Sequence, residues 1–228
     1  KLVNGMVGGE ILSSILAVCC VTVAFCSNLL MVNDKVSGAR KDLLISPTKK
    51  STFALSYYVA TLFSTLIISV VATVACFVYV ACQGWYLSFV DVLLVFLDVF
   101  LLTMFGTALS SCVNVFLSTN GQASAVGTIV SAGYGFICGA YMPISSFGTG
   151  LQTVLGFLPG TYGTSLLRNH ALAGVFREMA KQHYPADVIE KIKDSVDCNL
   201  YFFENKVSIG AMYGILIGSI VLFIGLYV

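Results

Sequence analysis

The sequence predicts an all-α integral membrane protein, and two observations carry this prediction. Hydrophobic residues make up 57% of the chain and charged residues only 10%, with a mean hydropathy of +0.91, far outside the range of soluble domains. The chain also contains five apolar segments of the length, roughly 20 residues, that a helix needs to cross a bilayer. The predicted transmembrane helices cover residues 11–32, 53–81, 85–117, 122–142 and 207–228.

The segments between these spans set their arrangement. The first two spans contain no charged residue, and the second is long enough to tilt in the bilayer. The short turn Cys82-Gln83-Gly84 makes the second and third spans an antiparallel hairpin. The pair Asn120-Gly121 favours another reversal before the fourth span. Because the chain has no internal repeat and no second soluble domain, residues 1–228 are predicted to form a single transmembrane domain.

The loop over residues 33–52 is short and basic, and such loops face the cytoplasm. Its apolar and charged residues fall on different sides of a helix, which predicts an amphipathic helix lying along the membrane surface. We expect this helix to start at Asn33 as its N-cap and to stop at Ser46-Pro47. The basic residues of the loop are Lys35, Arg40, Lys41, Lys49 and Lys50.

Alternation of the spans from a cytoplasmic loop 33–52 places residues 143–206 outside the cell. Within this outer segment, residues 144–158 are apolar but too short to span, and Pro143 and Pro159 bracket them. Such a stretch predicts a re-entrant outer helical hairpin, which dips into the bilayer where protein shields its broken backbone. Residues 188–196 then predict a small amphipathic outer helix.

Asp91 and Asp98 are the only acidic residues within the predicted spans. Seven residues apart, they fall on one face of a helix, about 10 Å from each other along its axis. Ionisable residues inside a membrane often mark a pathway for protons, ions or substrate. They can also fix packing, with Asp91 at the outer headgroups beside Trp85, and Asp98 paired to a neighbouring helix or to Arg168. Both interpretations remain open.

Small residues recur every four positions in the last span. Gly210, Gly214 and Gly218 form a stripe that lets another helix approach closely. This pattern does not specify whose helix docks, so it predicts either packing within the chain or contact with another subunit.

No catalytic or metal site emerges from the sequence. His170 and His183 lack the spacing of metal ligands, and we expect both to be solvated or interfacial. No phosphate-binding loop or nucleophile elbow is present, and a net charge of +1 gives no reason to expect a nucleic-acid partner. Six of the eight cysteines lie in apolar runs, whereas Cys82 and Cys198 are either free thiols or a disulfide.

Two motifs occur in a fixed order along the chain. Residues 31–47 have the character of a coupling helix followed by a Ser-Pro hinge. Residues 133–168 contain Gly133-Tyr134-Gly135, Leu158-Pro159 and Leu166-Leu167-Arg168, which look like a span followed by a re-entrant hairpin. In type and order these motifs resemble the permease subunits of type-2 ATP-binding-cassette exporters, which are found mainly in bacteria.

This resemblance implies an ATP-driven exporter permease in the bacterial cell membrane. A separate cytoplasmic ATPase subunit would bind ATP and Mg²⁺, so the chain itself would be neither an enzyme nor a cofactor-binding protein. Its partners would be that ATPase, a second permease in a homo- or heterodimer, and membrane lipid. The family has six spans, so we expect the chain to be truncated at its N-terminus. The residues expected to contact the ATPase are Asp34, Lys35, Arg40, Lys41 and Asp42.

Two other functions remain open on the sequence. One is a secondary transporter driven by an ion gradient, in which Asp91 and Asp98 exchange protons or sodium and the basic loop only sets the topology. The other is a membrane scaffold or sensor without transport, whose outer segment binds a partner.

Overall fold

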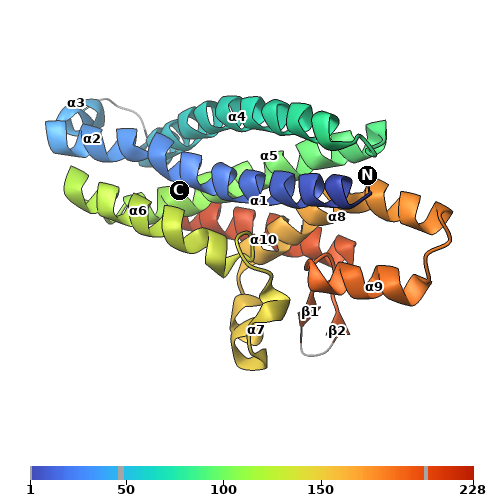
Figure 1. Cartoon of the computed structure of the whole chain (residues 1–228). Helices are drawn as coiled ribbons and strands as arrows, with labels where there is room; N and C mark the ends of the chain where they lie inside the picture. Colours follow the sequence, from blue (N-terminus) through green and yellow to red (C-terminus); the bar gives the residue numbers. More distant parts are fainter. Residues whose placement is uncertain (1, 46–48, 203–204) are drawn as a thin grey trace.

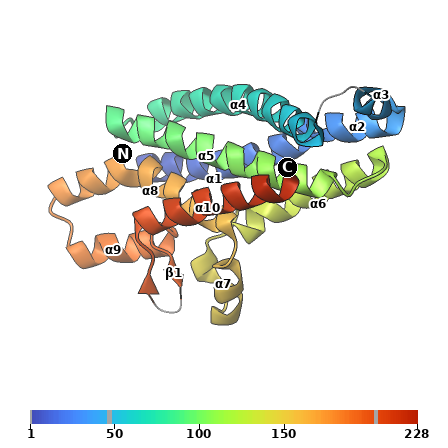
Figure 2. The ribbon, with the colours of Figure 1, turned by 180° about the vertical axis from the view of Figure 1, so that it is seen from behind.

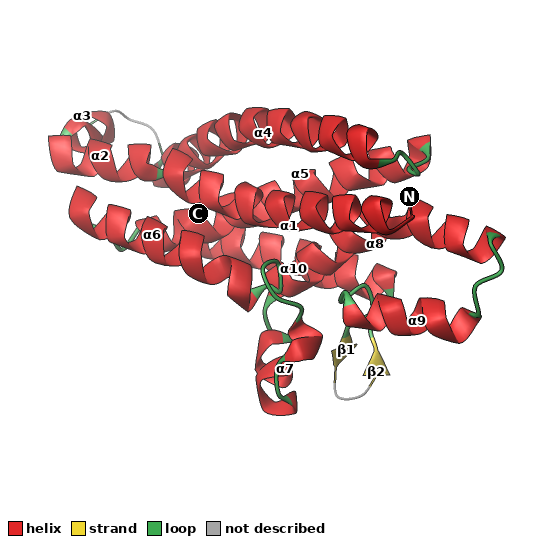
Figure 3. Cartoon of the chain, in the orientation of Figure 1, coloured by secondary structure: helices red, strands yellow, loops and turns green. Residues whose placement is uncertain are grey.

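The computed structural model describes residues 2–45, 49–202 and 205–228. This part of the chain is almost entirely helical, with one antiparallel pair of two-residue strands (Figure 3). Its long helices are α1 (Leu2–Ser27), α4 (Lys50–Gln83), α5 (Phe89–Asn114), α6 (Asn120–Ile137), α8 (Pro159–Lys181) and α10 (Ile209–Tyr227). Its shorter elements are α2 (Leu29–Ser37), α3 (Ala39–Leu44), the 3₁₀ turn η1 (Ile144–Ser146), α7 (Thr149–Leu155), α9 (Ala186–Ser195), β1 (Tyr201–Phe202) and β2 (Asn205–Lys206).

The long helices lie side by side in one bundle (Figure 1). Helix α1 packs against α4, α5 and α8, while α10 packs on α5 and α8 at the side turned away from α1 (Figure 2). Leu16, Leu102, Leu166 and Leu216 meet in the apolar core between these helices and are completely buried. The core therefore fixes α1, α5, α8 and α10 to one another.

Within the described residues, four helical segments are long and apolar enough to cross a membrane: Leu2–Ser37, Lys50–Gln83, Phe89–Asn114 and Ile209–Tyr227. They overlap the first, second, third and fifth predicted spans. The first begins earlier than predicted because Glu10 does not end the helix but forms an ion pair inside the bundle. Helix α6 occupies the position of the fourth predicted span and is not among these four.

The predicted amphipathic helix of the basic loop differs from the structure. Asn33 lies inside α2 and is not an N-cap, because the helix already begins at Leu29. The predicted helix is also broken into α2 and α3 at Gly38, whose φ of 85° lies in the left-handed region that glycine adopts easily. Ser46-Pro47, the predicted hinge, lies outside the described residues.

Helix α8 was not predicted, because residues 143–206 were all assigned to an outer segment with only short helices. The expected hairpin over residues 144–158 forms η1 and α7, and the chain then returns through α8, which begins at Pro159. Small residues allow this helix to approach its neighbours closely. A Cβ on Gly163 would overlap the side chain of Leu102, and a Cβ on Gly9 of α1 would lie 2.6 Å from Leu172.

The connecting segments gather at two ends of the bundle. Helices α2 and α3 and the start of α6 lie at one end, whereas α9 and the turn between α4 and α5 lie at the other (Figure 1). The predicted alternation of the spans across a membrane remains a prediction. That the α2–α3 end faces the cytoplasm remains a prediction.

Candidate functional site

The residues expected to meet an ATPase lie on α2 and α3, and Lys35 among them is already engaged within the chain. Its Nζ donates hydrogen bonds to the carbonyl oxygens of Asn114, Val115 and Leu117 at 3.0, 2.6 and 3.1 Å. The last carbonyls of a helix have no partner inside the helix and carry partial negative charge. The ammonium group therefore caps the end of α5 and ties α2 to it.

Asp34 joins α2 to a second long helix. Its carboxylate accepts a hydrogen bond of 2.5 Å from the hydroxyl group of Tyr57, which lies near the start of α4. The neighbouring basic residues are differently placed. Lys41 is exposed, and Arg40 lines a groove of about 260 Å³ between α3, α4 and the end of α10, where its Nε has no hydrogen-bond partner among the described residues. The side chain of Asp42 lies outside the described part.

Asn28 lies between the end of α1 and the start of α2. The sequence-based predictions include neither this break nor a role for Asn28. Its Nδ2 donates to the hydroxyl groups of Ser110 and Ser111 at 3.1 and 3.0 Å, and its Oδ1 accepts from Thr61 at 3.5 Å. The side chain is completely buried. This polar junction connects the base of α2 to α4 and α5, one turn or two before Asp34 and Lys35.

Asp91 and Asp98 both bind residues of α8, and the sequence predicts only that they share one face of a helix. Asp91 accepts from the backbone amide of Ser88 at 2.7 Å at the start of α5, and both of its oxygens bind the guanidinium of Arg177. Asp98 is deeper, with its Oδ2 2.6 Å from His170 Nδ1 and its Oδ1 accepting from the hydroxyl group of Tyr213 at 2.6 Å. Asp98 thus joins α5, α8 and α10.

Of the two expectations for His170, solvated or interfacial, the first is wrong. The residue is 8% exposed, because the Asp98 carboxylate supplies a partner inside the bundle. The sequence offers two partners for Asp98, a neighbouring helix or Arg168. The structure pairs Asp98 with residues of the neighbouring helices α8 and α10. Arg168 binds other groups.

Asp98→Asn is expected to lower the free energy of unfolding by about 1–3 kcal/mol, since it weakens two hydrogen bonds of a buried carboxylate. Asp91→Asn should cost less than about 1 kcal/mol, because the Arg177 side chain that pairs with it is 49% exposed to screening. Unfolding titrations of both variants in one detergent measure the difference. Equal losses would contradict the deeper role of Asp98.

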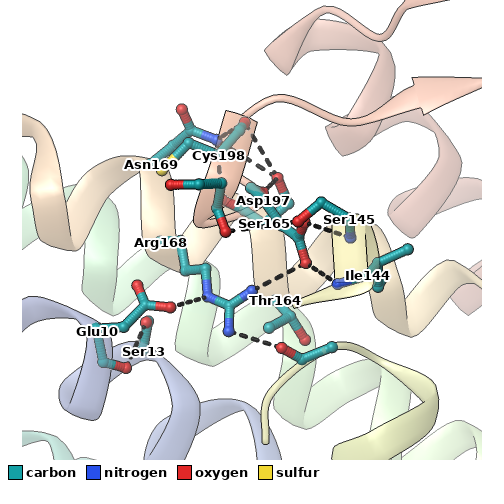
Figure 4. Close-up of polar contacts among 12 residues, drawn as sticks. Glu10, Ser13, Ile144, Ser145, Thr164, Ser165, Arg168, Asn169, Asp197 and Cys198 are labelled. Atoms are coloured by element: carbon teal, nitrogen blue, oxygen red, sulfur yellow. Dashed lines mark hydrogen bonds and ion pairs between the residues drawn. The ribbon is translucent and has the colours of Figure 1, made fainter. Parts of the chain in front are cut away.

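Arg168 organises a polar cluster inside the bundle (Figure 4). From α8 its Nε lies 3.1 Å from Glu10 Oε1 of α1, its Nη1 lies 3.4 Å from Asp197 Oδ2, and its Nη2 donates to the carbonyl of Gly139 at 2.6 Å. The Arg168 side chain is 2% exposed. One cation therefore holds α1, α8, the end of the α6 segment and the turn before β1 together.

Asp197 extends this cluster to the segment that follows α6. Its carboxylate accepts hydrogen bonds from the backbone amides of Ile144 and of Ser145, the latter at 3.0 Å. Burial raises the pKa of Asp197, and this effect is opposed by the two amides and by the Arg168 guanidinium. The Asp197 carboxylate thereby holds the segment after α6 at η1.

The glycine stripe of α10 does not pack against any other part of the chain that the structure describes. A Cβ added at Gly210, Gly214 or Gly218 would meet no atom within 4 Å. Helix α10 instead packs on α5 and α8 through its opposite side, which carries Met212 and Leu216. The described residues therefore give no support to packing inside the chain, and contact with another subunit stays a prediction.

The described residues contain no group of three or more His, Cys, Asp or Glu side chains that could hold a metal ion. Cys82 is an exposed free thiol and Cys198 a buried one, so the disulfide alternative is absent from the structure.

Comparison with known proteins identifies the chain's relatives. A family model described as "ABC-2 family transporter protein" matches residues 3–228, which is nearly the whole chain. No curated protein matches it.

Proposed function

Because the chain belongs to the ABC-2 family of transporters and is a multi-pass membrane permease, we propose that it exports its substrate from a bacterial cell with energy from a separate ATPase. The ATPase subunit would bind ATP and Mg²⁺ and hydrolyse the nucleotide. The permease would contribute the membrane path and would carry out no hydrolysis itself. The α2–α3 end would then face the cytoplasm, and α9 the outside.

One observation carries this proposal, namely that α2 is fastened to two long helices. Asp34 holds it to α4 through Tyr57, and Lys35 holds it to the end of α5. A push on α3 from a cytoplasmic partner would therefore move α4 and α5 together with α1, which continues directly into α2 at Asn28. Such coupling requires contacts that differ between the two states of the transporter.

We divide the five candidate coupling residues into two groups. Arg40, Lys41 and Asp42 of α3 would contact the ATPase, since Lys41 is exposed and Arg40 borders the groove between α3, α4 and the end of α10. Asp34 and Lys35 would transmit the movement, because both are bonded to the bundle. A second permease subunit would complete the transporter, and the open glycine stripe of α10 is the surface we assign to it.

Replacing Arg40 and Lys41 together by Gln is expected to weaken ATPase binding about tenfold or more, which corresponds to the loss of roughly 1.4 kcal/mol of charge-assisted contact. The amount of ATPase that copurifies with the tagged permease at several salt concentrations measures this. Lys49→Gln and Lys50→Gln, which remove two charges from the same loop beyond α3, form the matched control. ATPase recovery unchanged by the Arg40 and Lys41 substitutions would refute this assignment.

A further inference from the structure

A groove of about 560 Å³ lies between α5, α8 and α9. These helices come together at the end of the bundle away from α2 (Figure 1). The walls of the groove include the apolar side chains of Val90, Leu94, Phe176 and Ile189. Its volume is within the range of sites that hold small molecules. Helix α9, which covers one side of the groove, has no buried residue. The groove is therefore open at the surface and has an apolar wall beside polar and charged side chains.

The charged side chains that line the groove do not cancel. Asp91 and Arg177 neutralise each other through two hydrogen bonds. Lys193 remains, and the nearest carboxylate oxygen to it is Glu190 Oε2 at 3.9 Å. The other oxygen of Glu190 already accepts from Lys206 Nζ at 2.5 Å. The groove thus has a surplus positive charge at Lys193.

Lys193 is placed at the apolar wall of this groove. Its Nζ lies over the ring of Phe176, 5.4 Å from the ring centre, and the Lys193 side chain is 33% exposed. His170 also lines the groove. Its Nδ1 is bonded to Asp98, so its Nε2 is left for a hydrogen bond with another group. A cationic group and an imidazole nitrogen therefore border an apolar surface.

We propose that this groove binds an amphiphile with a single anionic group, a phosphate or carboxylate on an apolar body. The anion would bind at Lys193, and the apolar part would lie against Val90, Leu94 and Phe176. Trp85, 48% exposed and in the turn before α5, marks this end of the bundle as the membrane interface, where such molecules gather. This binding needs no ATPase and is independent of the proposed export.

Native mass spectrometry of the full-length protein in a neutral detergent tests the proposal with dioctanoyl phosphatidic acid as the probe. We expect saturable binding of one molecule, weakened about tenfold or more by Lys193→Gln, as for the loss of one charge-assisted hydrogen bond. Lys191→Gln, which removes an exposed lysine of the same helix, should leave binding unchanged. Ala173→Phe, which fills the groove and leaves every charge in place, should also weaken binding.

Three results would overturn the proposal. Equal binding by the Lys193→Gln variant and by the Lys191→Gln variant would show that the charge of Lys193 does not contribute to binding. Equally tight binding of the zwitterionic dioctanoyl phosphatidylcholine would show that only the apolar wall matters. Competition by inorganic phosphate at the same concentration as the amphiphile would identify an ion site without a role for the apolar body.

Discussion

Arg168→Met is expected to lower the free energy of unfolding by about 3–5 kcal/mol, the cost of breaking a buried ion pair from one side. Arg168 is the only cation that the described structure places against both Glu10 and Asp197. Its removal leaves two carboxylates inside the bundle without their partner and frees the carbonyl of Gly139. The loss is measured by unfolding titration in detergent, together with the yield of folded protein.

A variant that also neutralises the two carboxylates bound by Arg168 distinguishes the effect of unpaired charge from the effect of altered packing. Arg168→Met combined with Glu10→Gln and Asp197→Asn should recover part of the stability, because no unpaired charge then remains buried. Asn at position 197 can still accept from the amide groups of Ile144 and Ser145 through its oxygen. An Arg168→Met protein as stable as the unmodified one would contradict the role of this cluster.

Lys35→Met is expected to uncouple ATP hydrolysis from transport while leaving ATPase binding intact. The substitution removes three hydrogen bonds to the carbonyls at the end of α5 but keeps the basic residues of α3. Hydrogen bonds to a charged group contribute roughly 1.5–3 kcal/mol, and partial exposure of Lys35 reduces this value. Hydrogen exchange at residues 112–117 should accelerate about tenfold, in line with about 1.4 kcal/mol.

Two controls make this result specific. Lys41→Met removes a basic residue that has no bond to α5, so it should weaken ATPase binding and leave exchange at residues 112–117 unchanged. Lys35→Arg keeps the charge and should preserve most of the coupling. The Lys35→Met variant could show accelerated hydrogen exchange and still transport its substrate fully. This result would mean that the contact between α2 and α5 has no role in coupling.

Much of the fold follows from the apolar segments, because crossing a bilayer requires helices of a defined length. The helix α8 did not follow from them, since Arg168, Asn169, His170 and Arg177 lower its average hydropathy and Gly, Ser and Thr interrupt its apolar residues. Those small residues are what allow α8 to pack closely in the core. Contacts with α1, α5 and α10 set the position of α8. These helices are far from α8 in the sequence, so the local pattern of apolar residues does not reveal the contacts.

The candidate site was predictable in position but not in partners. The basic loop located α2 and α3, and helical spacing placed Asp91 and Asp98 on one face. Lys35 binds carbonyl groups at the end of α5, about 80 positions further along the chain, and a local sequence pattern cannot predict such a contact. Asn28 had a usable signal, because it is an amide side chain at the end of a long apolar run. Such residues are kept inside a membrane only when a partner lies near them.

The central claim is that α2 and α3 couple the permease to a separate ATPase. Affinity purification of the full-length protein from its native membrane, with partners identified by mass spectrometry, tests it most directly against a variant whose residues 34–45 are a Gly-Ser linker. Recovery of a cytoplasmic ATPase with the unmodified protein and its loss with the linker variant is the result we predict. Absence of any ATPase from both samples, with both proteins folded, would contradict the claim and favour a gradient-driven transporter.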